Sequence, residues 1–128
     1  MTIEQDSVYE KYALPLARHI QTIQTTAQYV MTFAVDDEFV ILKKLKRNRE
    51  AFKVLKSAYL KTPNDPIILL DLGRINMVMN NRTKGLTYLK KAKRNLNADF
   101  TKQIFIDQLS NPDFDKVRHM QEFKKLKE

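Results

Sequence analysis

The amino-acid sequence predicts an all-α fold built from a short stack of helical hairpins. Its 128 residues include only two glycines and four prolines, which is too few for a protein with many tight β-turns. Apolar residues recur at steps of three and four along most of the chain, the period of an amphipathic helix. The length suits one small domain, which we divide into an N-terminal helix (1–35), hairpins (36–99) and a C-terminal capping segment (100–128).

A long helix is predicted before residue 36. Its apolar positions alternate between steps of four and three residues, starting at Tyr9 and Ala13, and form a narrow seam about four heptads long. Burying a large apolar side chain stabilises a protein by about 1.5–3 kcal/mol, so the seam has to be covered. It can pair with the same helix of a second copy in a homodimer, or fold back as a cap on the chain's own hairpins. The candidate self-association residues are Leu16, Ile20, Ile23, Ala27 and Val30.

Two helical hairpins are predicted after this helix. The acidic run at residues 36–38 is expected to form the first turn of a new helix, because carboxylates are favoured at the positive end of the helix dipole. The first hairpin then covers residues 36–61. Two prolines, Pro63 and Pro66, break the chain, and a second hairpin covers residues 66–96.

The second helices of the two hairpins match each other at a shift of 34 residues. Small and large apolar residues superpose in three pairs, Ala51 with Gly85, Leu55 with Leu89, and Ala58 with Ala92. The first helix of the second hairpin adds a Leu-Gly pair at 72–73. Small residues at these positions allow two helix axes to approach closely, so we expect the helices to cross there.

This pattern resembles the tetratricopeptide repeat (TPR) family, with two degenerate repeats at about 32–65 and 66–99. The resemblance implies a short α–α superhelix whose first helices line a concave surface. Residues 111–126 resemble a tail that follows the last repeat in some bacterial TPR proteins. Physically, the apolar residues of this tail are expected to cover the open end of the stack, as terminal repeats require: Phe114, Val117, Met120, Phe123 and Leu126.

Catalytic and metal-binding patterns are missing from the sequence. There is no cysteine, and the two histidines, His19 and His119, have no second ligand at a metal-binding spacing. The serines lack the context of a catalytic nucleophile. We therefore predict a protein that is not an enzyme and that needs no cofactor or metal.

The concave surface is the predicted binding site. A mostly apolar groove with a basic rim suits a partner helix or an extended apolar peptide, so we predict a small noncatalytic adaptor or scaffold. The identity of the protein partner cannot be read from the sequence. The predicted groove residues are Phe33, Val40, Lys43, Lys44, Ile67, Leu70, Arg74, Met77 and Val78.

A basic strip on the second helices provides the alternative function. The chain has a formal net charge of +8, and this strip is expected on the convex side, where it could bind nucleic acid weakly and with a steep salt dependence. Nucleic acid is the less favoured partner, since the nearby aromatic residues, Tyr59 and Tyr88, are expected in the core. The strip consists of Lys53, Lys56, Lys90, Lys91, Lys93 and Arg94.

Location is predicted from the first residues and from the lack of a long apolar run. The chain opens with an acidic segment where a secretory signal would be basic. No run reaches the roughly 18 apolar residues of a membrane span. We therefore expect a cytoplasmic protein that does not enter a membrane.

Overall fold

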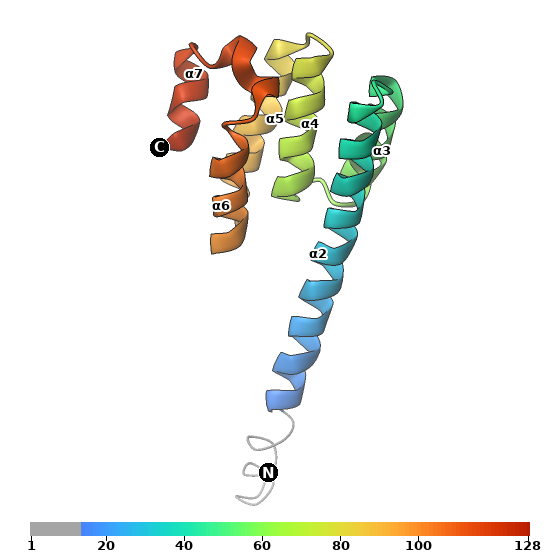
Figure 1. Cartoon of the computed structure of the whole chain (residues 1–128). Helices are drawn as coiled ribbons and strands as arrows, with labels where there is room; N and C mark the ends of the chain where they lie inside the picture. Colours follow the sequence, from blue (N-terminus) through green and yellow to red (C-terminus); the bar gives the residue numbers. More distant parts are fainter. Residues whose placement is uncertain (1–13) are drawn as a thin grey trace, which may run out of the picture. The chain divides into compact units, whose positions relative to one another are not determined.

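The computed structural model describes residues 14–128, in which helices occur without any β-strand, so the predicted all-α class is confirmed (Figure 1). The chain divides into two units, residues up to Phe33 and Ala34–Glu128. Both hairpins and both buried clusters belong to the second unit. No helix within residues 14–128 is long and apolar enough to cross a membrane. The elements are α2 (Leu14–Lys44), α3 (Asn48–Lys61), α4 (Pro66–Val78), α5 (Arg82–Arg94), α6 (Asp99–Gln108), η2 (Pro112–Val117), α7 (Gln121–Lys124) and η3 (Lys125–Lys127).

Helix α2 is longer than predicted, and the first hairpin therefore has no separate helix that begins at residue 36. The helix continues through the acidic run at residues 36–38, so the expectation that a new helix starts there is wrong. No glycine or proline occurs near the acidic run, between Leu16 and Lys44, so neither residue type interrupts the helix there. Carboxylates favour a helix start but do not create one. The boundary between the two units, after Phe33, lies inside this continuous helix.

The turns of the two hairpins have the same backbone geometry. Lys46, between α2 and α3, has a φ of 60°, and Asn80, between α4 and α5, has a φ of 62°. The next residue closes each turn in the same way, because Arg47 N donates to Leu42 O at 2.9 Å and Asn81 N donates to Asn76 O at 2.7 Å. A residue with left-handed backbone angles in each turn lets the chain reverse its direction within a few residues. The two turns stand 34 residues apart, which is the spacing found between the second helices.

The first buried cluster joins α2, α3 and α4. Phe39 of α2 is fully buried. It packs with apolar residues of α3 and α4, including Leu55 and Leu72, which are also inaccessible to solvent. Helix α4 is buried on all sides, because even its polar residues, such as Asn76, are largely covered. Its central position explains why its sequence is apolar almost throughout.

Helices α4 and α5 cross at the predicted glycines. A Cβ atom on Gly73 would lie 3.3 Å from the carbonyl oxygen of Gly85, and one on Gly85 would lie 3.2 Å from the carbonyl oxygen of Gly73. The two backbones therefore approach each other so closely that a Cβ atom at either glycine would make an unusually tight contact. Leu89 and Met77 fill the space on either side of the crossing.

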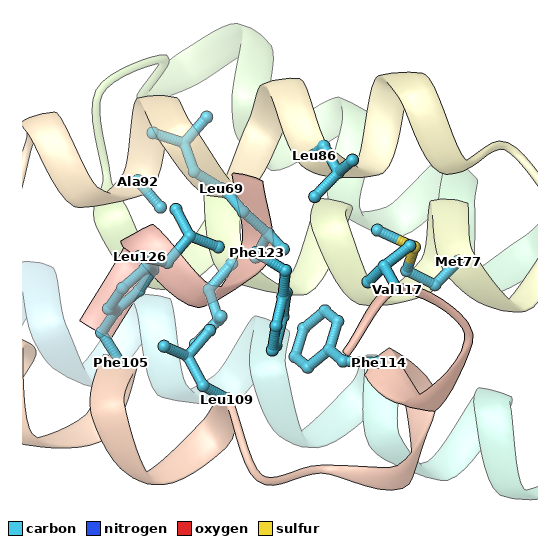
Figure 2. Packing of buried hydrophobic residues seen from close by; sticks show 12 residues of the cluster. Leu69, Met77, Leu86, Ala92, Phe105, Leu109, Phe114, Val117, Phe123 and Leu126 are labelled. Atoms are coloured by element: carbon cyan, nitrogen blue, oxygen red, sulfur yellow. The ribbon is translucent and has the colours of Figure 1, made fainter. Parts of the chain in front are cut away.

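The C-terminal segment packs against α4 and α5. Figure 2 shows Phe114 and Phe123 from this segment packed beside one another near Leu69 of α4, with ring centroids 5.5 Å apart. The side chain of Asn111 accepts from Asp113 N at 2.9 Å and so starts η2. The remaining members of this second cluster include Met77, Leu86, Leu89, Phe105, Leu109, Val117 and Leu126.

Candidate functional site

The α4 side of the predicted groove is covered by the chain itself. Ile67, Leu70 and Met77 are no more than 2% exposed. Leu70 and Met77 belong to the second cluster, where residues of α6 and η2 pack on them. These side chains are core residues in this structure, and a partner could reach them only by displacing the C-terminal segment. The sequence showed that this face is apolar, but it did not show what lies on it.

Arg74, predicted at the basic rim of the groove, is a buried ion-pair centre. It is 6% exposed, and its Nε donates to Asp113 Oδ2 at 3.2 Å. Lys43 of α2 donates to the same oxygen, while Arg74 Nη1 lies 3.6 Å from Asp71 Oδ1. The guanidinium also lies over the ring of Phe39, 5.0 Å from its centroid. The basic groups are thus satisfied by internal carboxylates and do not offer a clamp for an acidic ligand.

Asp71 and Asp36 form a pair of neighbouring carboxyl groups. Burial raises the pKa of Asp71 well above its usual range, the hydrogen-bonded Asp36 carboxyl raises it further, and Arg74 offsets part of the increase. Among the side chains that the structure describes, none donates a hydrogen bond to the buried Asp71 Oδ2. A protonated Asp71 carboxyl can donate a hydrogen bond to Asp36, so the contact between the two carboxyl groups depends on one proton.

The other predicted groove residues are dispersed. Val40 and Val78 are partly buried against the first cluster, and Lys44 is exposed at the end of α2. Phe33 belongs to the other unit and is 36% exposed. Together with the buried residues of α4, these positions do not form one open surface in the second unit.

The predicted seam lies on the first half of α2. Ala27 is exposed and Val30 is 62% exposed, as is their neighbour Met31 at 68%. The backbone at Leu16, Ile20 and Ile23 is helical, and the surroundings of these three side chains lie outside what the structure describes, as do Tyr9 and Ala13 altogether.

The basic strip is divided by local contacts. Lys90 pairs with Glu122 at 2.7 Å, and this hydrogen bond lowers the pKa of the Glu122 carboxyl. Lys93 donates to the backbone carbonyl of Lys125 at 2.9 Å. These two lysines hold the C-terminal segment on α5, while Lys53 and Arg94 are exposed. The strip is therefore not one continuous row of free cations.

The remaining two lysines of the strip converge on the two tyrosines. Lys56 donates to the hydroxyl of Tyr88, and Lys91 donates to the hydroxyl of Tyr59. Both tyrosines, which were expected in the core, are half-buried between α3 and α5 and pack against both buried clusters. The 34-residue shift does not align these residues, because Lys56 and Tyr88, like Tyr59 and Lys91, stand 32 positions apart on different helices.

Comparisons of the chain with protein-family models, curated proteins and solved structures gave no match. Among the residues that the structure describes, no group of three or more histidine, aspartate or glutamate side chains is placed to hold a metal ion.

Proposed function

We propose that this chain is a noncatalytic protein–protein interaction module, a small TPR-like adaptor, and that its contact surface is the apolar seam of α2. The exposed apolar side chains of the seam carry the proposal, with Val30 at 62% exposed. The repeated hairpin turns at Lys46 and Asn80 support the TPR-like description. A cytoplasmic location remains a prediction from the sequence.

The seam favours another helix as its occupant. Apolar residues at alternating steps of four and three form a stripe that fits the knobs-into-holes packing of a second helix. Residues 14–33 contain one formally charged residue, Arg18, in a chain of net charge +8. Two copies of this segment can therefore approach each other without strong repulsion. A second copy presents the same seam, so a twofold homodimer is the arrangement that we propose.

The seam is a better candidate than the predicted groove for an energetic reason. A partner in the groove would have to displace Phe114 and Phe123, which are at most 1% exposed. Exposing a side chain of this size loses about 1.5–3 kcal/mol of hydrophobic stabilisation. Ala27 and Val30, the seam residues whose side chains the structure describes, are exposed.

Light scattering after size-exclusion chromatography tests this proposal. We expect a dimer of the intact protein at micromolar concentration, and a monomer after Ile20→Glu with Ile23→Glu. The matched control, Gln21→Glu with Thr25→Glu, adds the same charge away from the seam and should remain a dimer. Circular dichroism should show unchanged helix content in all three proteins. A monomeric wild type, or equal dissociation of both double variants, would refute the seam as the interface.

A further inference from the structure

Four side chains meet on the surface where α3 lies beside α5. The rings of Tyr59 and Tyr88 are in edge-to-face contact, with centroids 5.9 Å apart and planes at 83°. Lys56 Nζ donates to the Tyr88 hydroxyl at 3.3 Å, and Lys91 Nζ donates to the Tyr59 hydroxyl at 3.1 Å. Both ammonium groups lie near the ring of Tyr59, at 5.0 and 4.9 Å from its centroid. The four residues are half-buried, so their positions are restrained by packing.

The local charge of this Lys–Tyr cluster is not balanced by the helices that build it. Helix α5 contains no acidic residue, and the acidic residue of α3, Glu50, pairs with Arg47. None of the ion pairs found within residues 14–128 includes Lys56 or Lys91. Two positive charges are thus held beside one aromatic ring without a carboxylate partner.

The hydrogen-bonding capacity of the cluster specifies the chemistry of a ligand. An ammonium group has three donors, and each lysine uses one of them on a tyrosine oxygen. Each hydroxyl accepts from a lysine, so its own hydrogen is available to donate. The cluster therefore presents donors from all four residues together with two positive charges. Its complement is a group with only acceptor atoms and about two negative charges.

We infer that the Lys–Tyr cluster of Lys56, Tyr59, Tyr88 and Lys91 is a binding site for a phosphate monoester or free phosphate. Such a group carries about −1.5 to −2 charge near neutral pH and has three strongly accepting oxygens. Charge-assisted hydrogen bonds from ammonium groups to phosphate are among the stronger polar contacts in proteins. The site shares no residue with the seam of α2, and it neither requires nor excludes a second copy of the chain.

The surroundings favour a single phosphate group over a nucleic-acid backbone. A nucleic-acid strand needs cations along a path, because each phosphate of the strand is bound by a separate group. The neighbouring cations on α5, Lys90 and Lys93, are instead engaged by Glu122 and by the Lys125 carbonyl. Lys56 and Lys91 are therefore the lysines of these two helices that the tyrosine hydroxyls hold together at one place.

Nuclear magnetic resonance of the tyrosine rings tests the site in the full chain. Inorganic phosphate and O-phosphoserine are titrated at constant ionic strength, and the ring signals of Tyr59 and Tyr88 should shift saturably. Lys56→Gln with Lys91→Gln should weaken binding about tenfold or more, because two charge-assisted contacts are lost. Lys53→Gln with Lys84→Gln removes the same charge from exposed positions of the same helices and should change binding less than about twofold.

Additional ligands and one further variant identify the source of the phosphate and test whether the tyrosine hydroxyls take part in binding. A preference for a phosphoserine peptide over inorganic phosphate would assign the site to a phosphorylated protein, and equal binding would assign it to free phosphate. Tyr59→Phe with Tyr88→Phe keeps both rings and should weaken binding by removing two donors. The inference is overturned if neither ring shifts, if both lysine pairs have the same effect, or if single-stranded oligothymidylate displaces phosphate at lower concentration than phosphoserine does.

Discussion

Adding a methyl group at the crossing of α4 and α5 should destabilise the protein more at Gly73 than at Gly85. A Cβ atom on Gly73 would lie 2.7 Å from Leu89 Cδ2 and 2.9 Å from Leu89 Cγ. A Cβ atom on Gly85 would lie 2.7 Å from Met77 Cε and 3.2 Å from Met77 Sδ. The first contact involves the branch point of a fully buried side chain, whereas the second involves the end of a flexible one.

The expected change in the free energy of unfolding is the difference between two opposing contributions. Replacing glycine by alanine inside a helix gains about 1 kcal/mol of helix propensity. Overpacking a dense core costs about 1–3 kcal/mol when the neighbours cannot move. Because Leu89 Cγ cannot shift without moving its whole side chain, Gly73→Ala should lower the free energy of unfolding by up to about 2 kcal/mol. Met77 can rotate its terminal methyl group away, so Gly85→Ala should change the free energy by less than about 0.5 kcal/mol.

Urea denaturation followed by circular dichroism measures both free energies. For a unit of the size of Ala34–Glu128, 1 kcal/mol corresponds to a change in Tm of about 4–8 °C. Combining Gly73→Ala with Leu89→Ala should destabilise less than the sum of the two single changes, because the new methyl group occupies part of the cavity. If Gly73→Ala is as stable as Gly85→Ala, the close approach at Leu89 does not limit the crossing and the reasoning fails.

Three further predictions concern buried charge and the C-terminal cap. The pKa of Asp71 is raised in the folded protein, so the folded protein keeps a proton that the unfolded chain releases near pH 4. The free energy of unfolding of the wild type should therefore fall as pH rises above about 4. Asp71→Asn should remove this pH dependence, so its free energy of unfolding should exceed that of the wild type most at pH 8. A variant that is more stable than the wild type at pH 4 but not at pH 8 would contradict this prediction. Phe123→Ala should lower the free energy of unfolding by about 3–5 kcal/mol, whereas Phe100→Ala at an exposed position should lower it by less than about 1 kcal/mol in the same urea titration. Asp113→Ala should destabilise by about 1.5–3 kcal/mol because it leaves buried Arg74 without its close carboxylate, and thermal unfolding that matches the wild type would show that this ion pair contributes nothing.

Local features of the helical hairpins could be predicted because their causes lie within a few residues of the chain. The proline pair at 63 and 66 prevents a continuous helix, and the structure ends α3 at Lys61 and begins α4 at Pro66. Small residues such as Gly73 and Gly85 are needed where two helix axes approach closely, so the crossing could be predicted without coordinates. The apolar period of the tail likewise predicted that Phe114 and its neighbours are buried.

The continuity of α2 and the candidate site could not be predicted in the same way. An acidic run is compatible with both a helix start and a helix interior, and the structure placed residues 36–38 in the interior of α2. The phosphate-site residues depend on a pairing between α3 and α5, in which Lys56 reaches Tyr88 from 32 positions away. Neither residue has a local signal that specifies the other.

The sequence by itself determined which segments are helical and which side of each helix is apolar, because backbone propensity and apolar period act over one or two turns. Only the tertiary structure decided what covers each apolar side. In the tertiary structure, Asp113 and Phe114 lie on the face of α4 that was predicted to line the groove, and Arg74 is buried there. Apolar period gives the direction of a helix face but carries no information about its partner, which is set by the path of the chain through long-range packing.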